Sequence, residues 1–324
     1  MRKTLILLLA CLLIVSALCS ACADNTPSAT VKSEPGPHDY VVTEADGGEF
    51  RPLPVDLSPG APVNYNINSS LKIYQDPTIR VERHKFYSDI YRCDVFYATV
   101  EIRDPSQIRT AAAAKDFSTT SFMPANLIAK HNNAVLAING DYYAAFSGNK
   151  ANNYVLRQGT LYRDTVAEDL DMLLIDEDGD FHVLPAGESL ATADKTQVNG
   201  KKVVNALQFG PALVIDGEKV ADERILNEAL MPTYVKPDRR AQRICIAQID
   251  SLHYMVVACC NYGIDLLSFR DLVMSLADCK VVYNLDGGAS SQLILLKWKY
   301  NQTTGEGEVR SVTDIIYFAS AWFR

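Results

Sequence analysis

Hydrophobic and polar residues alternate along residues 71–103, a stretch that is rich in Tyr, Val and Ile. A period of two residues predicts several antiparallel strands there. Residues 121–146 and 267–288 show instead a helical period, followed by a polar turn and a short apolar strand. Paired apolar runs between these segments predict hairpins, with turns at Gln158-Gly159, Asp178-Gly179 and Asp216-Gly217. The pattern predicts an α+β fold in which mixed or antiparallel strands outnumber a few helices.

The two helix–strand segments align with each other at a constant offset of 145 residues and both end in Asn-x-Asp. The first motif is Asn139-Gly140-Asp141 and the second is Asn284-Leu285-Asp286. Such residues at a strand end commonly form Asx turns, which is the structural interpretation. A second interpretation is a pseudo-repeat of two helix–strand halves, which would bring Asp141 and Asp286 to one cleft. Chance similarity between two helix–strand sequences is the third, and all three remain open.

The second motif continues into small and hydroxyl-bearing residues. Gly287 and Gly288 allow backbone N–H groups to converge on an anion such as phosphate, and Ser290 and Ser291 would add donors. A tight turn between two strands is the alternative interpretation of the glycines. Because no GxGxxG or P-loop pattern is present, nucleotide binding has no support.

Three arginines precede the apolar strand predicted at residues 244–249. Arg243 stands directly before this strand, where its planar guanidinium would bind two oxygens of a phosphate. A solvated loop position is the alternative, and it fits Arg239 and Arg240 better. The five histidines show neither HxH nor HxxxH spacing, so no metal site is predicted. A GxSxG motif is also absent, so a serine hydrolase elbow has no support.

Composition limits the class of protein. The chain has 324 residues, of which 48% are hydrophobic and 22% are charged, and this suits one large globular domain or two small ones. A net charge of -8 without a basic run argues against a nucleic-acid partner. The cysteines beyond residue 23 are odd in number and irregularly spaced, which predicts buried thiols with at most one chance pair. They are Cys93, Cys245, Cys259, Cys260 and Cys279.

Residues 1–23 have the features of a signal peptide or a lipoprotein signal. A basic start is followed by an uncharged apolar run and by small residues that end near Cys22. Free secretion, a lipid anchor at Cys22 and an uncleaved anchor helix all remain open, and each places the protein outside the cytoplasm. Residues 24–69 are rich in Pro, Ser, Thr, Asp and Gly and are predicted to form a disordered or extended tether. Residues 70–324 then form the folded domain.

Six segments, taken in order, resemble the phosphodiester glycosidase family. This family includes the uncovering enzyme N-acetylglucosamine-1-phosphodiester α-N-acetylglucosaminidase and bacterial exopolysaccharide-related members. The segments are AVLAINGDYYA, YVLRQGTLYRD, LQFGPALVIDGE, RICIAQIDSLHYMVV, YNLDGGASSQL and RSVTDIIYF. The resemblance implies a hydrolase that cleaves a sugar-1-phosphodiester at the anomeric carbon. Its substrates would be cell-surface or exopolysaccharide glycans, and it would need no cofactor.

The resemblance also implies roles for individual residues. Asp141 and Asp286 would supply a base, a nucleophile or a stabiliser of the oxocarbenium-like sugar, with no assignment between them. Arg243, with the amides of Gly287 and Gly288, would stabilise the departing phosphate. A divalent cation held by the aspartates is allowed but not required. The remaining residues implied to contact substrate are Asn139, Gly140, Tyr142, Gly210, Pro211, Asn284, Ser290, Ser291 and Asp314.

The sequence departs from the family pattern in three places. Ala289 replaces a third glycine, and Ile244-Cys245 replaces a Thr-Ala pair. An Asp-Gly-Arg stretch common in the family is missing near residues 260–262. These departures leave two other functions open. One is a non-catalytic glycan-binding protein on the same fold, and the other is a glycosyl or phosphoglycosyl transferase in exopolysaccharide assembly.

Overall fold

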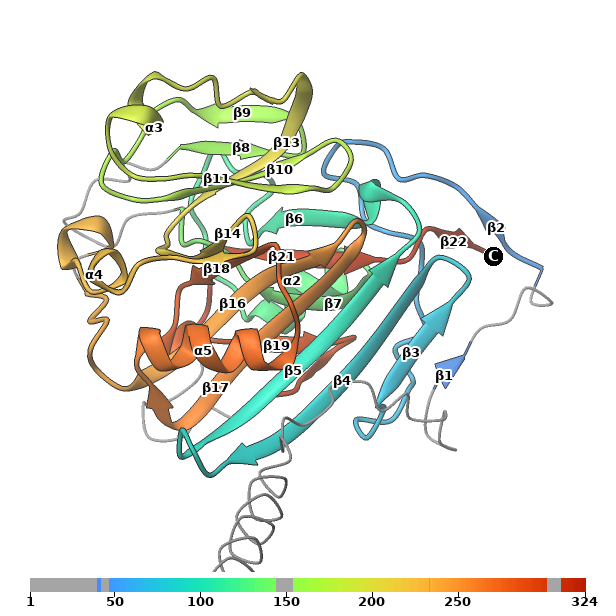
Figure 1. Cartoon of the computed structure of the whole chain (residues 1–324). Coiled ribbons are helices and arrows are strands. Elements are labelled where there is room, and N and C mark those ends of the chain that lie inside the picture. Colours follow the sequence, from blue (N-terminus) through green and yellow to red (C-terminus); the bar gives the residue numbers. More distant parts are fainter. Residues whose placement is uncertain (1–39, 42–46, 144–153, 233, 302–309) are drawn as a thin grey trace, which may run out of the picture. The chain divides into compact units, whose positions relative to one another are not determined.

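The computed structural model in Figure 1 describes residues 40–41, 47–143, 154–232, 234–301 and 310–324. The chain divides into Met1–Glu34 and Pro35–Arg324, and all the described residues belong to the second unit. The predicted signal at residues 1–23, with Cys22, lies outside the described residues, as do residues 24–39 of the predicted tether.

The largest sheet has nine strands among the described residues, and its neighbours are antiparallel except for one parallel pair, β1 with β3. The prediction of antiparallel strands in residues 71–103 is confirmed by the meander of β3, β4 and β5. In spatial order the strands are β1 (Tyr40–Val41), β3 (Ile73–Asp76), β4 (Ile79–Ser88), β5 (Cys93–Ile102), β17 (His253–Ile264), β16 (Ala241–Asp250), β18 (Val281–Leu285), β14 (Ala212–Ile215) and β15 (Glu218–Lys219).

Three smaller antiparallel sheets complete the described part of the chain. One has the order β20 (Trp298–Lys299), β19 (Leu293–Leu295), β7 (Ala134–Asn139), β21 (Asp314–Ala319) and β6 (Ile108–Ala112). Another has the order β11 (Phe181–Leu184), β10 (Met172–Asp176), β13 (Lys201–Gln208), β8 (Val155–Arg157) and β9 (Thr160–Arg163), with β12 (Gln197–Val198) paired to β13. The last pairs β2 (Glu49–Phe50) with β22 (Trp322–Phe323).

The three predicted hairpins are confirmed as β8–β9, β10–β11 and β14–β15. At two of their turns, both central residues have positive φ. Gln158 and Gly159 lie at 45° and 71°, and Asp216 and Gly217 lie at 52° and 83°. This left-handed geometry matches the twist of the flanking strands, and glycine adopts it without steric cost.

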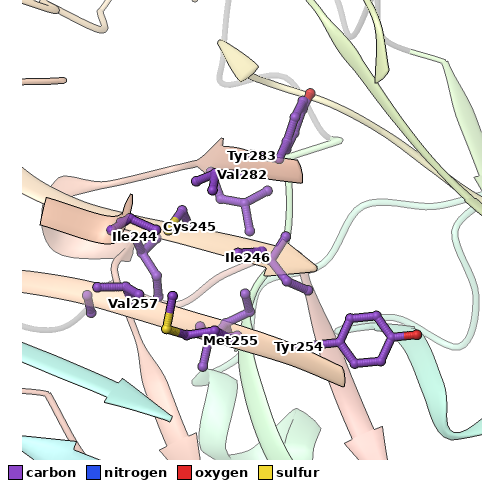
Figure 2. Close-up of a cluster of buried hydrophobic side chains, with 14 of the residues drawn as sticks. Ile244, Cys245, Ile246, Tyr254, Met255, Val257, Val282 and Tyr283 are labelled. Carbon is purple, nitrogen blue, oxygen red and sulfur yellow. The ribbon is translucent and has the colours of Figure 1, made fainter. Parts of the chain in front are cut away.

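The main hydrophobic core is formed by residues of the three larger sheets. Figure 2 shows its centre, where β16, β17 and β18 contribute side chains such as Ile246, Met255 and Val282. The five-stranded sheet follows the period of two: Ile316 and Phe318 of β21 face this core, while Ile315 and Tyr317 face a second core beneath α2. Both faces of that sheet are therefore covered.

Helices are few in the described part of the chain. They are α2 (Ala125–His131), α3 (Glu188–Thr192), α4 (Asp222–Ile225) and α5 (Leu266–Leu276), with 3-10 turns η2 (Pro105–Gln107), η3 (Glu228–Leu230) and η4 (Gly288–Ser290). Asp265 caps α5 by accepting a hydrogen bond from the N–H of Ser268 at 2.9 Å. Among the described helices, none has the length and apolar character needed to span a bilayer. A β-rich α+β arrangement with mostly antiparallel sheets agrees with the predicted class.

The internal repeat stays a prediction. Helix α2 precedes β7 and helix α5 precedes β18, so both predicted helix–strand pairs exist. The two strands lie in different sheets, with β7 between β19 and β21 and β18 between β16 and β14. The Asn-x-Asp motifs therefore end strands of two separate sheets.

Residues 47–69 correct the domain boundary expected at residue 70. This segment is extended, but it packs on the domain instead of leaving it: the N–H of Ala61 donates to Ser320 O at 2.9 Å, and β2 pairs with β22. Val63, Tyr65 and Ile67 are partly buried against the main core. These three apolar residues alternate with exposed polar ones, a short period of two that the surrounding Pro and Gly obscure.

The prediction that the cysteines beyond residue 23 are buried is confirmed. Cys93, Cys245, Cys259, Cys260 and Cys279 are all buried with free thiols. They pack as small apolar side chains within the large sheet and its α5 face.

Candidate functional site

A cleft of about 410 Å³ opens where β16 and β18 end side by side. Its wall contains Asp286, Gly287, Gly288 and Ala289, which follow β18, and the residues that lead into β16. The pairing of Ile244 with Leu285 sets this geometry, because it places Arg243 next to Asp286 at the ends of neighbouring strands. The structure thus brings the predicted carboxylate, the glycines and the predicted arginine into one cavity.

Asp286 is a carboxylate held in a nearly water-free position, with 8% of its surface exposed. Burial raises its pKa to about 6, while a hydrogen bond from Ser290 and the positive charge of Arg310 act in the opposite direction. The group is therefore ionised near neutral pH and takes up a proton in mildly acidic solution. An ionised carboxylate with a raised pKa is suited to act as a base or a nucleophile.

Gly287 is required by packing. A side chain at this position would collide with the carbonyl oxygen of Gln242 on β16. Gly288 has a φ of +56°, in the left-handed region that glycine favours. The turn interpretation and the ligand interpretation are compatible here, because the close turn lets backbone line the cleft.

Arg243 is almost fully buried at 4% exposure and is anchored by backbone carbonyls. Its Nη2 donates to Lys236 O at 2.6 Å and to Arg239 O at 3.0 Å, and its Nε donates to Ile264 O at 3.3 Å. These carbonyl acceptors are neutral dipoles, and they fix the position of the guanidinium at the cleft wall. Arg243 both shapes the loop before β16 and supplies a fixed cation.

Asn139 connects the two Asn-x-Asp motifs. Its Nδ2 donates to the carbonyl oxygen of Asp286 at 2.8 Å, and its Oδ1 accepts from the N–H of Gln292 at 3.1 Å. The end of β7 in one sheet is therefore tied to the end of β18 in another. The first motif supports the backbone of the second.

Asp141 does not line the cleft. It is 1% exposed, and its Oδ1 accepts from Arg157 Nη2 at 2.8 Å while its Oδ2 accepts from the N–H of Gln208 at 2.7 Å. This is a buried ion pair completed by a backbone donor, the arrangement that offsets the cost of removing charges from water. Asp141 remains electrostatically close to the cleft, because burial and then the charges of Asp286, Tyr142 and Asp141 raise the pKa of Tyr234 on the cleft wall.

Asp314 joins this buried pair as a second carboxylate. Its Oδ2 lies 4.0 Å from Arg157 Nη2 and accepts no hydrogen bond from the described residues. Burial and the neighbouring charge of Asp141 raise the pKa of Asp314 to about 7. Gly140 sits between the two carboxylates, and any side chain there would collide with the carboxyl group of Asp314. One arginine thus serves two acids, and the pKa of Asp314 is the one that burial raises.

Four further predicted residues lie near the cleft without lining its described wall. Asn284 donates from Nδ2 to Gly210 O at 2.8 Å, and its N–H donates to Pro211 O at 3.3 Å, so the buried Gly210-Pro211 turn is fastened to β18. Tyr142 has a φ of +59°. Burial and the charge of Asp286 raise the pKa of Tyr142 to about 12, which keeps its phenol protonated at neutral pH.

Several buried polar atoms in this region accept or donate no hydrogen bond within the described residues. They are Nε2 and Oε1 of Gln242, Oδ1 of Asn284 and Oγ of Ser291. Gln242 belongs to the cleft wall and is 2% exposed. Buried polar groups are nearly always paired, so an unpaired amide beside a cleft marks a place where a polar ligand or water fits.

Sequence reasoning missed Arg157, Gln208, Gln242 and Arg310. Arg157 and Gln208 hold Asp141, while Gln242 and Arg310 line the cleft. Of these four residues, only Arg157 could have been recognised from the sequence, because it is a charged residue inside an apolar strand just before a turn. Charges are rarely fully buried unless they are paired, so its position pointed to a buried carboxylate partner.

No group of three or more His, Cys, Asp or Glu side chains among the described residues is arranged to hold a metal ion. Asp141 and Asp314 share the cation Arg157. Asp286 stands apart from that pair, on the cleft wall.

Fold and cleft together define the class of protein, a β-rich α+β domain in which a buried carboxylate faces a basic cleft. The sequence model of the phosphodiester glycosidase family matches residues 132–319. Because this range covers more than half of the 324 residues, the chain belongs to the phosphodiester glycosidase family. The resemblance noted in the sequence is thereby confirmed. No curated protein sequence matches the chain.

Solved structures show the same fold. The catalytic domain of zebrafish N-acetylglucosamine-1-phosphodiester α-N-acetylglucosaminidase, auto-inhibited by its pro-peptide, is similar with a TM-score of 0.57 and 14% identity, over 81% of this chain and 87% of that one. A hypothetical protein from Synechocystis is similar with a TM-score of 0.52 and 15% identity, over 80% of this chain and 65% of that one. At these identities the similarity establishes the fold alone.

Proposed function

We propose that the protein is an extracytoplasmic hydrolase that cleaves a sugar-1-phosphodiester at the anomeric carbon. The observation that carries the proposal is the cleft in which Asp286 lies beside Arg243, Arg310 and two glycines, in a member of the phosphodiester glycosidase family. An α-N-acetylglucosamine-1-phosphodiester is the first substrate to test, because the similar zebrafish protein is named for it.

The proposed reaction breaks the bond between the anomeric carbon and a phosphate oxygen. Water supplies a hydroxyl group to the sugar, and the phosphate leaves as a monoester that carries the aglycone. A phosphate monoester has a second pKa near 6, so the leaving group needs little protonation. Arg243 and Arg310 would stabilise the charge that develops on it, which is the role of electrostatic preorganisation.

Asp286 would act on the sugar side of the bond. Its pKa of about 6 leaves it ionised at neutral pH, as a base or a nucleophile requires. Asp141, which is sealed against Arg157 and the N–H of Gln208, is assigned a positioning role. Asn139, two residues before Asp141, would help to hold Asp286 in place, because its Nδ2 donates a hydrogen bond to the carbonyl oxygen of Asp286.

The test is turnover of a chromogenic α-N-acetylglucosamine-1-phosphodiester by the wild type and by Asp286→Asn. We expect the variant to lose about 10²–10⁴-fold in kcat/KM, the usual range for removing an acid–base group. Asp278→Asn is the matched control, since Asp278 is exposed and lies outside the cleft wall. Glycan binding without turnover of several sugar phosphodiesters would contradict the hydrolase and favour a binding protein.

Product analysis separates hydrolysis from transfer. We expect free sugar in water, even when a sugar acceptor is added in excess. Transfer of the sugar to that acceptor in preference to water would instead support a transferase in exopolysaccharide assembly.

We further propose that the enzyme acts on cell-surface or exopolysaccharide glycans, either secreted or held by a lipid on Cys22. The support is the sequence of residues 1–23, with its basic start, apolar run and terminal small residues. Fractionation of the expressing cells tests this. Lipid anchoring predicts membrane-bound enzyme that Cys22→Ser releases or leaves unprocessed, whereas cytoplasmic enzyme would overturn the proposal.

A further inference from the structure

The cleft wall has an unusual charge for this protein. Among the described residues, five basic side chains line it together with one acid, Asp286, although the whole chain carries a net charge of -8. The basic residues are Lys236, Arg239, Arg240, Arg243 and Arg310. Cations gathered in a concave surface attract anions and raise their local concentration. A single phosphodiester carries only one negative charge, so the described part of the wall presents more basic side chains than that group needs.

The cations fall into two groups by position. Arg243 and Arg310 accompany Asp286: Arg243 lies next to it across the paired strands, and Arg310 acts on its charge. Lys236, Arg239 and Arg240 come from the segment that precedes β16. The second group therefore adds positive charge to the wall from a segment other than the one that carries the reacting carboxylate.

Arg240 is a fixed cation of this second group. Its Nη2 donates to the carbonyl oxygens of Tyr91 and Gly263, each at 2.6 Å, and its Nε donates to Tyr262 O at 3.2 Å. These carbonyls hold the guanidinium in place but do not neutralise it. No described carboxylate lies within ion-pair distance of Arg240 or Arg239. Glu228 partly offsets the second group, because it pairs with Lys236.

Arg239 is the adaptable member of the group. It is exposed, and its side chain makes no hydrogen bond or ion pair with the described residues. Its backbone is nevertheless fixed, because its carbonyl oxygen accepts from Arg243 Nη2. A long cationic side chain on a fixed backbone at a cleft rim is placed to close on an anionic group of a ligand.

We propose that the cleft binds a ligand with at least two negative charges. The phosphodiester would lie against Asp286, Arg243 and Arg310, and a second anionic group, a phosphate or a carboxylate on the aglycone side, would lie against Arg239 and Arg240. This inference rests on the proposed phosphodiester cleavage. The substrate class is then an acidic glycan or a chain of repeating sugar phosphates, not a neutral sugar phosphodiester.

The experiment compares three substrates that share one sugar-1-phosphodiester and differ in the aglycone, which is neutral, phosphorylated or carboxylated. We expect kcat/KM to be about tenfold higher with at least one charged aglycone, as charge-assisted hydrogen bonds allow. The advantage should shrink as ionic strength rises, because salt screens partly exposed charges. The group that gives the larger gain identifies the second anion.

Arg239→Gln tests the assignment. The variant should reduce the ratio of kcat/KM between charged and neutral substrates by about three- to fivefold, mainly through KM. Lys130→Gln is the matched control, since it removes the same charge from an exposed position on helix α2, outside the cleft wall, and should leave the ratio unchanged. A wild-type ratio near one, or an equal response to both variants, would overturn the inference while hydrolysis itself stands.

Binding of a sugar bisphosphate, measured by calorimetry, tests the dianionic site independently of the proposed hydrolysis. If no phosphodiester is cleaved, the proposed function fails. Binding of the bisphosphate that weakens in Arg239→Gln and not in Lys130→Gln would still support the dianionic site. Absence of binding, or binding that both variants leave intact, would overturn it.

Discussion

Asp141 and Asp286 end the same short motif and yet occupy opposite electrostatic situations. Asp141 is buried and accepts hydrogen bonds from the guanidinium of Arg157 and from the backbone N–H of Gln208. Asp286 lines a cleft and accepts a hydrogen bond from Ser290, and burial raises its pKa to about 6. A motif at a strand end thus delivers a carboxylate, but residues distant in sequence decide whether that carboxylate supports the structure or faces a ligand.

The largest effect on stability should come from the cation that serves the sealed pair. Arg157→Met should lower the free energy of unfolding by about 3–5 kcal/mol, because two buried carboxylates lose their positive partner. Arg310→Met, beside the other carboxylate, should cost less than about 1 kcal/mol, since Arg310 is exposed. Chemical denaturation measures both. Similar losses of unfolding free energy in the two variants would contradict the proposed difference between the buried Asp141–Arg157 pair and the cleft carboxylate Asp286.

The carboxylates themselves should respond in opposite directions. Asp141→Asn should lower the free energy of unfolding by about 2–3 kcal/mol, because it weakens a buried ion pair. Asp286→Asn should leave stability unchanged or raised at pH 7.5, since its raised pKa shows that the fold disfavours the charged form. Thermal and chemical unfolding of the two variants at matched concentration give the comparison. A stability loss in Asp286→Asn as large as that in Asp141→Asn would contradict it.

Stability should also fall as the pH rises from about 4 to about 7. The pKa of Asp314 is raised to about 7 in the folded protein, whereas an unfolded Asp has a pKa near 3.9. In that window the folded state binds more protons than the unfolded state, so the free energy of unfolding decreases with pH. Asp286 adds to the decrease up to pH about 6.

Two variants sharpen this pH prediction. Asp314→Asn should flatten the slope by up to about 1.4 kcal/mol per pH unit, the value for one proton. Asp278→Asn, at an exposed position, should keep the wild-type slope. Denaturant titrations at pH 4.5, 6 and 7.5 provide the measurement. A slope that Asp314→Asn leaves unaltered would refute the raised pKa.

The smallest expected effect compares two glutamines of β16 that are each 2% exposed. Gln248 accepts from the N–H of Phe181 at 2.8 Å and donates to Asp180 Oδ1 at 2.9 Å, whereas the side-chain amide of Gln242 at the cleft has no hydrogen-bond partner among the described residues. Gln248→Met should lower the free energy of unfolding by about 1–2 kcal/mol, and Gln242→Met should raise it by about 0.5–1 kcal/mol. A loss of stability in both would show that Gln242 is satisfied in the apo protein.

Local patterns predicted the elements well. The alternation in residues 71–103 corresponds to β3–β5, and three turn dipeptides mark three real hairpins. The domain start was placed too late, because the packed segment around Val63, Tyr65 and Ile67 is short and lies among turn-forming residues. The charge of Arg157 inside an apolar strand was a signal, but it did not identify the partners, because Asp141, which follows β7, and Asp314 of β21 are brought beside it only by the tertiary structure. Periodicity carries no information about such contacts.

The sequence by itself determined where most strands and turns lie and which family the chain resembles. It also determined that a carboxylate and two glycines follow one strand. These depend on backbone preferences and on residues close together in the chain. Only the tertiary structure decided that Asp286 faces a basic cleft while Asp141 is neutralised by Arg157. The reason is physical: solvation and charge pairing depend on distances in space, and the sheets set those distances by pairing strands that are remote in sequence.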